Sequence, residues 1–201
     1  MKNSSTVRRF ITLILTLTAC SVVLSGCLSF GRFGKTISRS LTGIGTKSPQ
    51  QLTAFFMQNN PQAERSAVLR LAKLYVAEAK SEGINSDCAF VQMCLETGFL
   101  RFGGLVTPDM HNYCGLGAVD AEHPGERFET EELGVRAHIQ HLHAYATDAS
   151  VTLVHPLVDN RYKWVNPRGK AKTIFELSGT WAADKNYGQK LDALLTRLEQ
   201  F

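Results

Sequence analysis

The stretch that decides the fold is DCAFVQMCLETGFLRFGGLVTPDMHNYCGL, residues Asp87 to Leu116. Its first half carries apolar side chains on more than one side of a helix, at Phe90, Val91, Met93, Cys94 and Leu95. Such a wide apolar surface is typical of a helix enclosed by others, not of a helix with one face in water. The stretch therefore predicts a central, buried helix that stops near Gly98.

One ionisable residue, Glu96, lies in this apolar segment, with Gln92 one turn earlier on the same face. Partial desolvation near the mouth of a cleft favours the neutral form of a carboxylic acid and raises its pKa. The neutral acid is the form that can protonate a departing oxygen. The pattern indicates Glu96 as a general acid, and the structural alternative is a helix-end Glu bonded to nearby backbone or to Arg101.

Three blocks carry a resemblance to a known family. LETGFLRFGG followed by NYCGLG resembles the Glu-Ser/Thr-Gly and Asn-x-x-Gly-Leu/Ile signatures of bacterial cell-wall glucosaminidases, glycoside hydrolase family 73. GTWAADKNYGQKLDALL, from Gly179 to Leu195, resembles the aromatic-Ala-Thr-Asp-x-x-Tyr-x-x-Lys-Leu block that closes those domains. The blocks occur in the family's order over roughly residues 65 to 200. The resemblance implies a mainly helical (α+β, lysozyme-like) fold, in which a helical lobe surrounds the Glu96 helix and a short loop or hairpin forms a wall.

The resemblance also implies a function. It predicts hydrolysis of peptidoglycan glycan strands at N-acetylglucosamine linkages, with Glu96 as general acid and without cofactor or metal. Tyr187 matches the motif Tyr and is expected to line the cleft, although a core position is an equal alternative. Asn112 is expected to shape the loop near Glu96. Gln92, Asn112 and Tyr187 together form the predicted substrate-binding set.

A second carboxylate is harder to place. Inverting glycosidases need one about 6.5 to 9.5 Å from the acid to activate water, and retaining ones need a nucleophile about 5 to 5.5 Å away. The wall between Arg101 and Glu129 offers Asp120, Glu122, Glu126 and Glu129, of which Glu122 is our assignment. Substrate assistance, in which the acetamido oxygen of the sugar attacks the anomeric carbon, stays open as an alternative.

Two other functions fit the same pattern. A muramidase or lytic transglycosylase uses a similar fold with a single Glu, so the bond that is cut is not decided by Glu96. A peptidoglycan-binding lipoprotein without turnover would keep the fold and lose the reaction.

The amino terminus predicts export and a lipid anchor. Lys2, Arg8 and Arg9 precede an apolar run from Ile11 to Leu24 that is too short for a lasting membrane span. The run ends in Leu24-Ser25-Gly26-Cys27, which matches the bacterial lipobox. We therefore expect residues 1–26 to be a lipoprotein signal peptide and Cys27 to carry the lipid that holds the protein on the periplasmic face or surface of a bacterial membrane.

The charge balance excludes an electrostatic nucleic-acid partner. The chain has 22 Lys and Arg against 18 Asp and Glu, but three of the basic residues lie in the signal peptide. No basic stripe interleaved with aromatic residues remains. The mature chain has about 150 residues for a fold, enough for one domain with a core of its own, and we expect a monomer.

Local signals divide the rest of the chain. Residues 27–47 are rich in Gly, Ser, Thr and basic residues and predict a flexible tether. The domain is expected over 48–201. Ser48-Pro49 and Asn60-Pro61 predict the starts of two helices, and Gly83 the end of the second. Thr130 and Asp184 predict the starts of two later helices.

Histidine and cysteine spacings suggest no further chemistry. His138, His141 and His143 share one predicted helix, but positions i, i+3 and i+5 do not converge on one metal. Cys88 and Cys94 lie about 9 Å apart along a helix, beyond disulfide reach. Either could meet Cys114, but their apolar setting favours buried free thiols and argues against a cysteine nucleophile.

Overall fold

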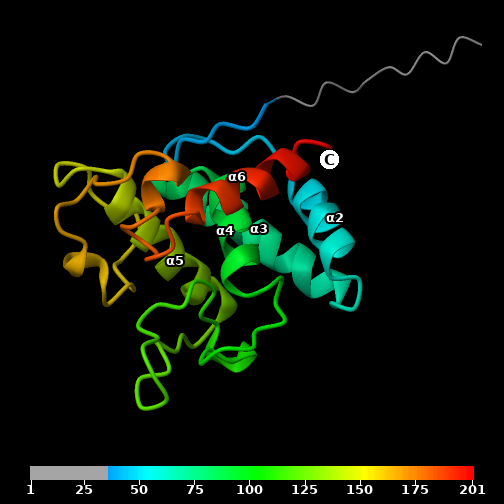
Figure 1. Cartoon of the computed structure of the whole chain (residues 1–201), viewed down its shortest axis with the longest axis horizontal. Coiled ribbons are helices and arrows are strands. Elements are labelled where there is room, and N and C mark those ends of the chain that lie inside the picture. Colours follow the sequence, from blue (N-terminus) through cyan, green and yellow to red (C-terminus); the bar gives the residue numbers. More distant parts are fainter. Residues whose placement is uncertain (1–35) are drawn as a thin grey trace, which may run out of the picture. The chain divides into compact units, whose positions relative to one another are not determined.

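The computed structural model describes residues 36–201 (Figure 1). Within this range, α-helices and short 3-10 helices are joined by loops, and the only β-structure is isolated bridges. The mainly helical fold predicted from the sequence is confirmed. In chain order the elements are α2 (Pro49–Asn59), α3 (Arg65–Glu82), α4 (Ser86–Glu96), η1 (Pro108–Met110), α5 (Glu131–Ala146), η2 (Tyr162–Trp164), η3 (Ile174–Leu177) and α6 (Tyr187–Leu198).

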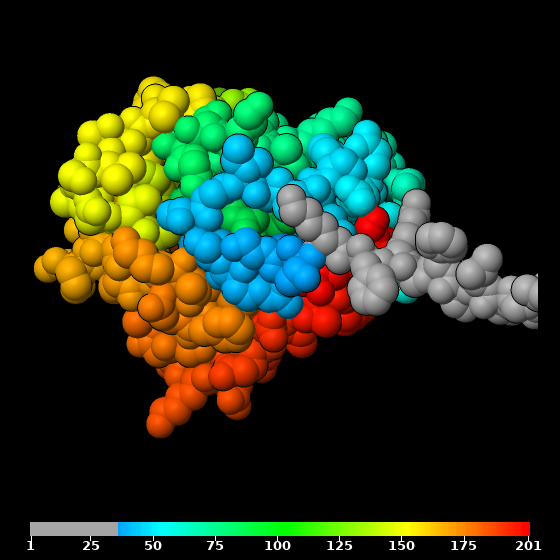
Figure 2. All heavy atoms as spheres, turned by 90° about the horizontal axis from the view of Figure 1, so that it is seen from above, coloured from blue at the N-terminus to red at the C-terminus, as the bar shows by residue number. Residues whose placement is uncertain are grey.

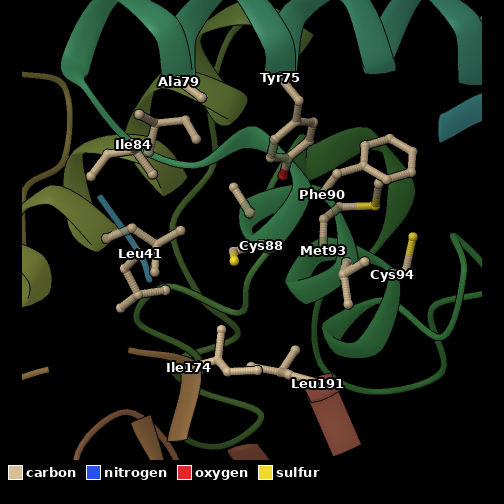
Figure 3. Packing of buried hydrophobic residues seen from close by; sticks show 14 of the residues in the cluster. Leu41, Tyr75, Ala79, Ile84, Cys88, Phe90, Met93, Cys94, Ile174 and Leu191 are labelled. Atoms are coloured by element: carbon tan, nitrogen blue, oxygen red, sulfur yellow. The ribbon is translucent and has the colours of Figure 1, made fainter. Parts of the chain in front are cut away.

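Helix α4 is the centre of the fold. Every residue from Ser86 to Cys94 is buried, and α2, α3, α5 and α6 all contact the helix. Figure 3 shows Tyr75 of α3 pointing toward Phe90 and Met93 of α4, and the Tyr75 and Phe90 rings meet edge to face at 5.7 Å. A helix apolar on all sides is stable only when enclosed in this way, so the central helix is confirmed.

Side chains mark most helix starts as predicted. Ser48 accepts from Gln51 N at 3.3 Å, and Thr130 accepts from Leu133 N at 3.2 Å. Asn85, for which no capping role was predicted, caps α4 by accepting from Asp87 N at 3.0 Å. Gly83 ends α3 with φ of 68°, a left-handed conformation that few side chains tolerate.

Two predicted starts are wrong. The helix expected at Asn60-Pro61 begins at Arg65, because Glu64 accepts from two backbone N–H groups of the first turn, while Asn60 closes the end of α2. Asp184 does not cap α6, which begins at Tyr187. Asp184 lies three residues before α6, where its carboxylate accepts from Asn186 N and Lys190 Nζ. A carboxylate can accept from several nearby donors, so residue spacing alone does not determine where these two helices begin.

The tether predicted over residues 27–47 extends too far, because residues 36–47 pack on the domain. Ile37 and Leu41 are buried in the main core. Leu41 N donates to Lys172 O at 2.9 Å, and Asn85 N donates to Leu41 O at 2.8 Å. Figure 2 shows the segment in blue, lying between green and orange parts of the chain. An extended segment whose backbone pairs with two others has no helical period, so the sequence pattern predicts a tether where the chain is in fact packed.

Buried Asp87 fixes the end of this segment. Its carboxylate accepts from Thr46 N at 2.7 Å, Thr46 Oγ1 at 3.0 Å and Lys47 N at 3.1 Å. The chain comes so close to α4 that a Cβ at Gly45 would lie 2.1 Å from Ser86 Oγ. Only glycine fits this approach.

The wall, residues 101–129, is a loop with one hairpin-like turn. Ala118 and Pro124 form an isolated bridge, and Val119 N donates to His123 O at 2.9 Å. Figure 1 shows it in green, extending away from α4 and α5. The expected loop or short hairpin is what the chain forms here.

The predicted signal peptide and the lipidation site Cys27 lie outside the described residues. Among residues 36–201, no helix has the length and apolar character that crossing a bilayer requires.

Candidate active site

Two cavities meet at Glu96, the last residue of α4. The larger has a volume of about 480 Å³ and the smaller about 230 Å³, and Glu96 and Gly115 line both. The larger is also lined by residues 114–119 of the wall, His141, Tyr145, Arg161, Trp181 and Ala182. The smaller is bounded by Thr97, Gly98, Phe102, residues 104–106 and Asn112. The carboxyl group of Glu96 thus borders both hollows.

Two donors hold one oxygen of Glu96. Trp181 Nε1 donates to Glu96 Oε1 at 3.0 Å, and Tyr187 Oη donates to the same oxygen. Glu96 stays open to the cleft while protein atoms crowd around it. This desolvation raises its pKa above the ordinary range, and the two hydrogen bonds oppose the rise. Since Oε1 accepts both bonds, Oε2 is the oxygen left to carry a proton.

A chain of buried hydrogen bonds supports Tyr187 from behind. Gln92 Nε2 donates to Tyr187 Oη at 2.9 Å. Its Oε1 therefore faces His138 Nε2 at 3.2 Å, which must carry the proton and donate. His138 Nδ1 is then an acceptor for Tyr75 Oη at 2.8 Å. In this series of hydrogen bonds, every group donates to the next one in the direction of Glu96.

The protonation states of His138 and Tyr187 agree with this direction of hydrogen-bond donation. Burial lowers the pKa of His138 to about 3, so the imidazole is neutral and carries one proton. Burial, and then the neighbouring Glu96, raise the pKa of Tyr187, which keeps its hydroxyl as a donor. Four helices supply the five side chains, so folding of the core sets the hydrogen bonds of the acid.

A left-handed turn follows the acid and leads the chain into the wall. Phe99, Leu100 and Phe102 have φ of 57°, 58° and 52°, values uncommon for residues other than glycine. Asn60 Nδ2 donates to Phe99 O at 2.8 Å. Arg101 donates to the carbonyls of Gly98 at 3.0 Å and Asn59 at 2.7 Å. Arg101 thus holds the turn and does not pair with Glu96, which removes that structural alternative.

Comparison with known proteins gives the same family as the sequence motifs. The family model described as mannosyl-glycoprotein endo-beta-N-acetylglucosaminidase matches residues 72–200. The chain belongs to this glucosaminidase family. It is also 38% identical over 161 residues to an uncharacterized protein of Borreliella burgdorferi, covering 80% of this chain and 78% of that one. No solved structure matches. Membership supports a glycoside hydrolase that acts on peptidoglycan glycan strands.

In this glucosaminidase domain, the three residues predicted to bind substrate are all buried, and each has its own role. Tyr187 is 5% exposed, belongs to the main core and lines neither cavity, so it takes the core position and reaches Glu96 from behind through its hydroxyl. Gln92 is 1% exposed and both ends of its amide bond protein side chains, so its predicted substrate contact is corrected to a positioning role behind Tyr187. Asn112 is also 1% exposed, and it shapes the loop as expected: its amide bonds Leu116 N, Leu116 O and Glu126 O at 2.9 to 3.0 Å.

The glucosaminidase wall does not bring Glu122 to the acid. Glu122 is exposed at the hairpin-like turn, and neither it nor Asp120, Glu126 or Glu129 lines the two cavities that the described residues form at Glu96. Asp120 instead caps the turn by accepting from Glu122 N and His123 N. Our assignment of Glu122 as the second carboxylate is therefore corrected. Spacing could not reveal that Asp120 caps the turn or that Glu126 accepts from Asn160.

Sequence reasoning missed two groups at this glucosaminidase site. Trp181 lies inside the third motif block, and an aromatic residue there was the available signal. His141 lines the larger cavity and pairs with Asp159, while His138 and His143 face Tyr75 and Tyr162. The three imidazoles diverge as the helical spacing predicted. Cys88, Cys94 and Cys114 are buried free thiols whose pKa values burial raises, which argues against a cysteine nucleophile.

Proposed function

We propose that this domain hydrolyses the glycan strands of peptidoglycan at N-acetylglucosamine linkages, with Glu96 as general acid. The observation that carries the proposal is the position of Glu96 where both cavities meet, with Oε1 held by Trp181 and Tyr187 and Oε2 free. Family membership supports the substrate class.

The proton needed for cleavage is held on Glu96 Oε2. Desolvation by the surrounding protein atoms favours the protonated acid, and the two donors on Oε1 keep the carboxyl group in one orientation. As the bond from the anomeric carbon to the leaving oxygen breaks, that oxygen takes the Oε2 proton. The resulting carboxylate is then stabilised by the same two donors.

The two cavities favour cleavage within a strand. A polymer that passes Glu96 can place sugar rings on both sides of the scissile bond, one side in each cavity. Trp181 and Tyr145 line the larger cavity, and their rings offer apolar faces of the kind on which sugar rings pack. Gly115, common to both linings, leaves room for the strand beside the acid.

Mass spectrometry of released muropeptides tests this proposal and separates its alternatives. The domain is incubated with peptidoglycan as wild type and as Glu96→Gln, which keeps the shape and the acceptor on Oε1 but removes the proton. We expect reducing-end N-acetylglucosamine from wild type and a rate lower by about 10² to 10⁴ for the variant, without a loss of melting temperature.

Other products would contradict the proposal in distinct ways. Reducing-end muramic acid indicates a muramidase, anhydromuramic acid a lytic transglycosylase, and no product a binding protein. Full activity of Glu96→Gln would remove the acid from its role.

We also propose that the enzyme acts as an exported lipoprotein held on a bacterial membrane through Cys27. The apolar run that ends in Leu24-Ser25-Gly26-Cys27 supports this placement. Labelling cells with a fatty-acid analogue should tag the wild-type protein and not Cys27→Ala. A tagged, detergent-partitioning Cys27→Ala protein would contradict the anchor.

A further inference from the structure

A histidine and a carboxylate pair at the side of the larger cavity. His141 of α5 lines this cavity together with Glu96, and its Nδ1 lies 2.7 Å from Asp159 Oδ2. Asp159 is 1% exposed, and its other oxygen accepts from Arg161 N at 2.8 Å. Gln140 Oε1 accepts from Asp159 N at 3.1 Å and fixes the backbone there. The carboxylate is thus held rigidly behind the imidazole.

This pairing leaves the second nitrogen of His141 as a free acceptor. A carboxylate oxygen only accepts, so Nδ1 carries the proton and neutral His141 has its lone pair on Nε2. No described residue bonds Nε2. Among described residues, the only buried side-chain nitrogen or oxygen without a partner is Arg168 Nε, so Nε2 of His141 is reached by solvent. The cavity is the open space beside this residue.

We propose that His141, oriented by Asp159, is the general base that activates the attacking water in the reaction for which Glu96 is the acid. This inference rests on the proposed function. It places the second catalytic group on a helix and not in the wall, where the sequence analysis sought a carboxylate.

The indole of Trp181 connects the two catalytic groups. Its Nε1 donates to Glu96, and its ring meets the His141 ring edge to face with centroids 5.1 Å apart. Acid and base therefore line one cavity, and both contact Trp181. An inverting enzyme needs room in such a cavity for a water molecule between base and sugar.

Bonds and protons balance in the proposed hydrolysis. One water proton goes to His141 Nε2 while the water oxygen bonds to the anomeric carbon. The bond from that carbon to the leaving oxygen breaks, and its electron pair takes the Oε2 proton of Glu96. The products are two shorter strands, a Glu96 carboxylate and a His141 imidazolium beside Asp159. Solvent then returns one proton from His141 to Glu96.

The surroundings of His141 suit this role. Asp159 stands on one side, Tyr145 and Trp181 pack on the ring at 5.4 and 5.1 Å, and Arg161 lines the same cavity. His138, one turn earlier, is neutral because burial lowers its pKa to about 3. The carboxylate of Asp159 is the negative group in direct contact with the imidazole, and it would stabilise the imidazolium.

The chain supplies a matched control. His123 and Asp120 form the same kind of pair, with Nδ1 to Oδ1 at 2.9 Å, but both side chains are exposed on the wall. Neither lines the cavities at Glu96. His123→Ala therefore removes an equivalent pair outside the proposed site.

The test uses the full domain with a soluble glycan oligosaccharide. His141→Ala should lower the cleavage rate by about 10² to 10⁴, and added imidazole should restore part of it. His123→Ala should keep the wild-type rate. The first product of a β-linkage should be the α-anomer, read by NMR before mutarotation, because a single displacement inverts the anomeric carbon.

Asp159→Asn is the second variant, in case His141→Ala fails to fold. An Asn there can keep its oxygen on Arg161 N and turn its amide toward Nδ1. This moves the His141 proton to Nε2 and abolishes the base. A rate loss comparable to His141→Ala, at near wild-type melting temperature, is expected.

The outcomes separate the two proposals. Activity of His141→Ala or a β-anomeric product overturns the base, while an inactive Glu96→Gln keeps the acid. A rate loss that imidazole does not restore and that follows an equal loss of melting temperature assigns the pair to packing and overturns the base. Active Glu96→Gln instead overturns the proposed function.

Discussion

Two buried amides show how differently the two sides of the cleft are built. Gln92 in α4 and Asn112 in the wall are each 1% exposed, and both ends of each amide are hydrogen-bonded. Gln92 joins side chains of α5 and α6, 46 and 95 positions away. Asn112 bonds only backbone atoms of its own loop, 4 and 14 positions away. The helical floor is held by the tertiary structure, and the wall mainly by itself.

This difference decides where the chemistry can be placed. Two exposed acids of the wall pair within it, Asp120 with His123 and Asp109 with Arg127. Exposed pairs of this type contribute little and hold no fixed geometry. The floor holds Glu96, Trp181, Tyr187 and His141 on segments that pack against the core, so we expect catalysis to depend on the floor and the wall to guide the strand.

The largest expected effect is that of Gln92→Leu. The variant leaves His138 Nε2 and Tyr187 Oη without their buried partner, at a cost of about 1–3 kcal/mol each. The free energy of unfolding should fall by that sum, and the cleavage rate should fall because Tyr187 is no longer held. Urea unfolding and a cleavage assay measure the two.

Asn112→Ala is the matched change in the wall. It should lower stability by about 1 kcal/mol, because water can reach parts of the loop, and raise KM more than it lowers kcat. Equal losses of kcat in the two variants would break the distinction between floor and wall.

A smaller effect concerns the pH dependence of stability with Glu96→Gln. Partial desolvation raises the pKa of Glu96 in the folded state, so the contribution of Glu96 to stability is fully present below the unfolded pKa and is lost as pH rises through the folded pKa. Gln does not titrate. The melting temperature of the variant should therefore rise relative to wild type from acid to neutral pH. The open cleft screens the effect, so the gain should stay below about 2–4 °C.

Thermal melts across this pH range check the sign. A relative gain that shrinks toward neutral pH would mean that the hydrogen bonds from Trp181 and Tyr187 outweigh desolvation. The floor would then stabilise the carboxylate and not the acid.

The smallest effect is expected in the wall. Asp120→Asn, Glu122→Gln and Glu129→Gln, made singly, should each change unfolding free energy by less than about 0.5 kcal/mol and leave the cleavage rate unchanged. The same assays apply. A large rate loss in Glu122→Gln would restore the carboxylate that the sequence analysis placed there and would move catalysis into the wall.

The sequence by itself determined the local features. Ser48, Gly83, Asn85 and Thr130 mark helix ends because a cap bonds groups within three or four residues. The apolar surface on all sides of α4 predicted a helix enclosed by others, and the acid within that segment indicated a functional residue. The three motif blocks supplied the family, and with it the expected fold and the candidate acid.

Only the tertiary structure decided which polar groups meet. Periodicity shows that Gln92 and His138 are on buried faces but not that they bond each other, and it cannot pair His141 with Asp159 in a loop 18 positions later. It also gave no signal for residues 36–47, whose burial depends on Asp87 and on Lys172, far along the chain. A hydrogen bond needs two atoms within about 3 Å, and only the packing of the helices brings residues so distant in sequence that close.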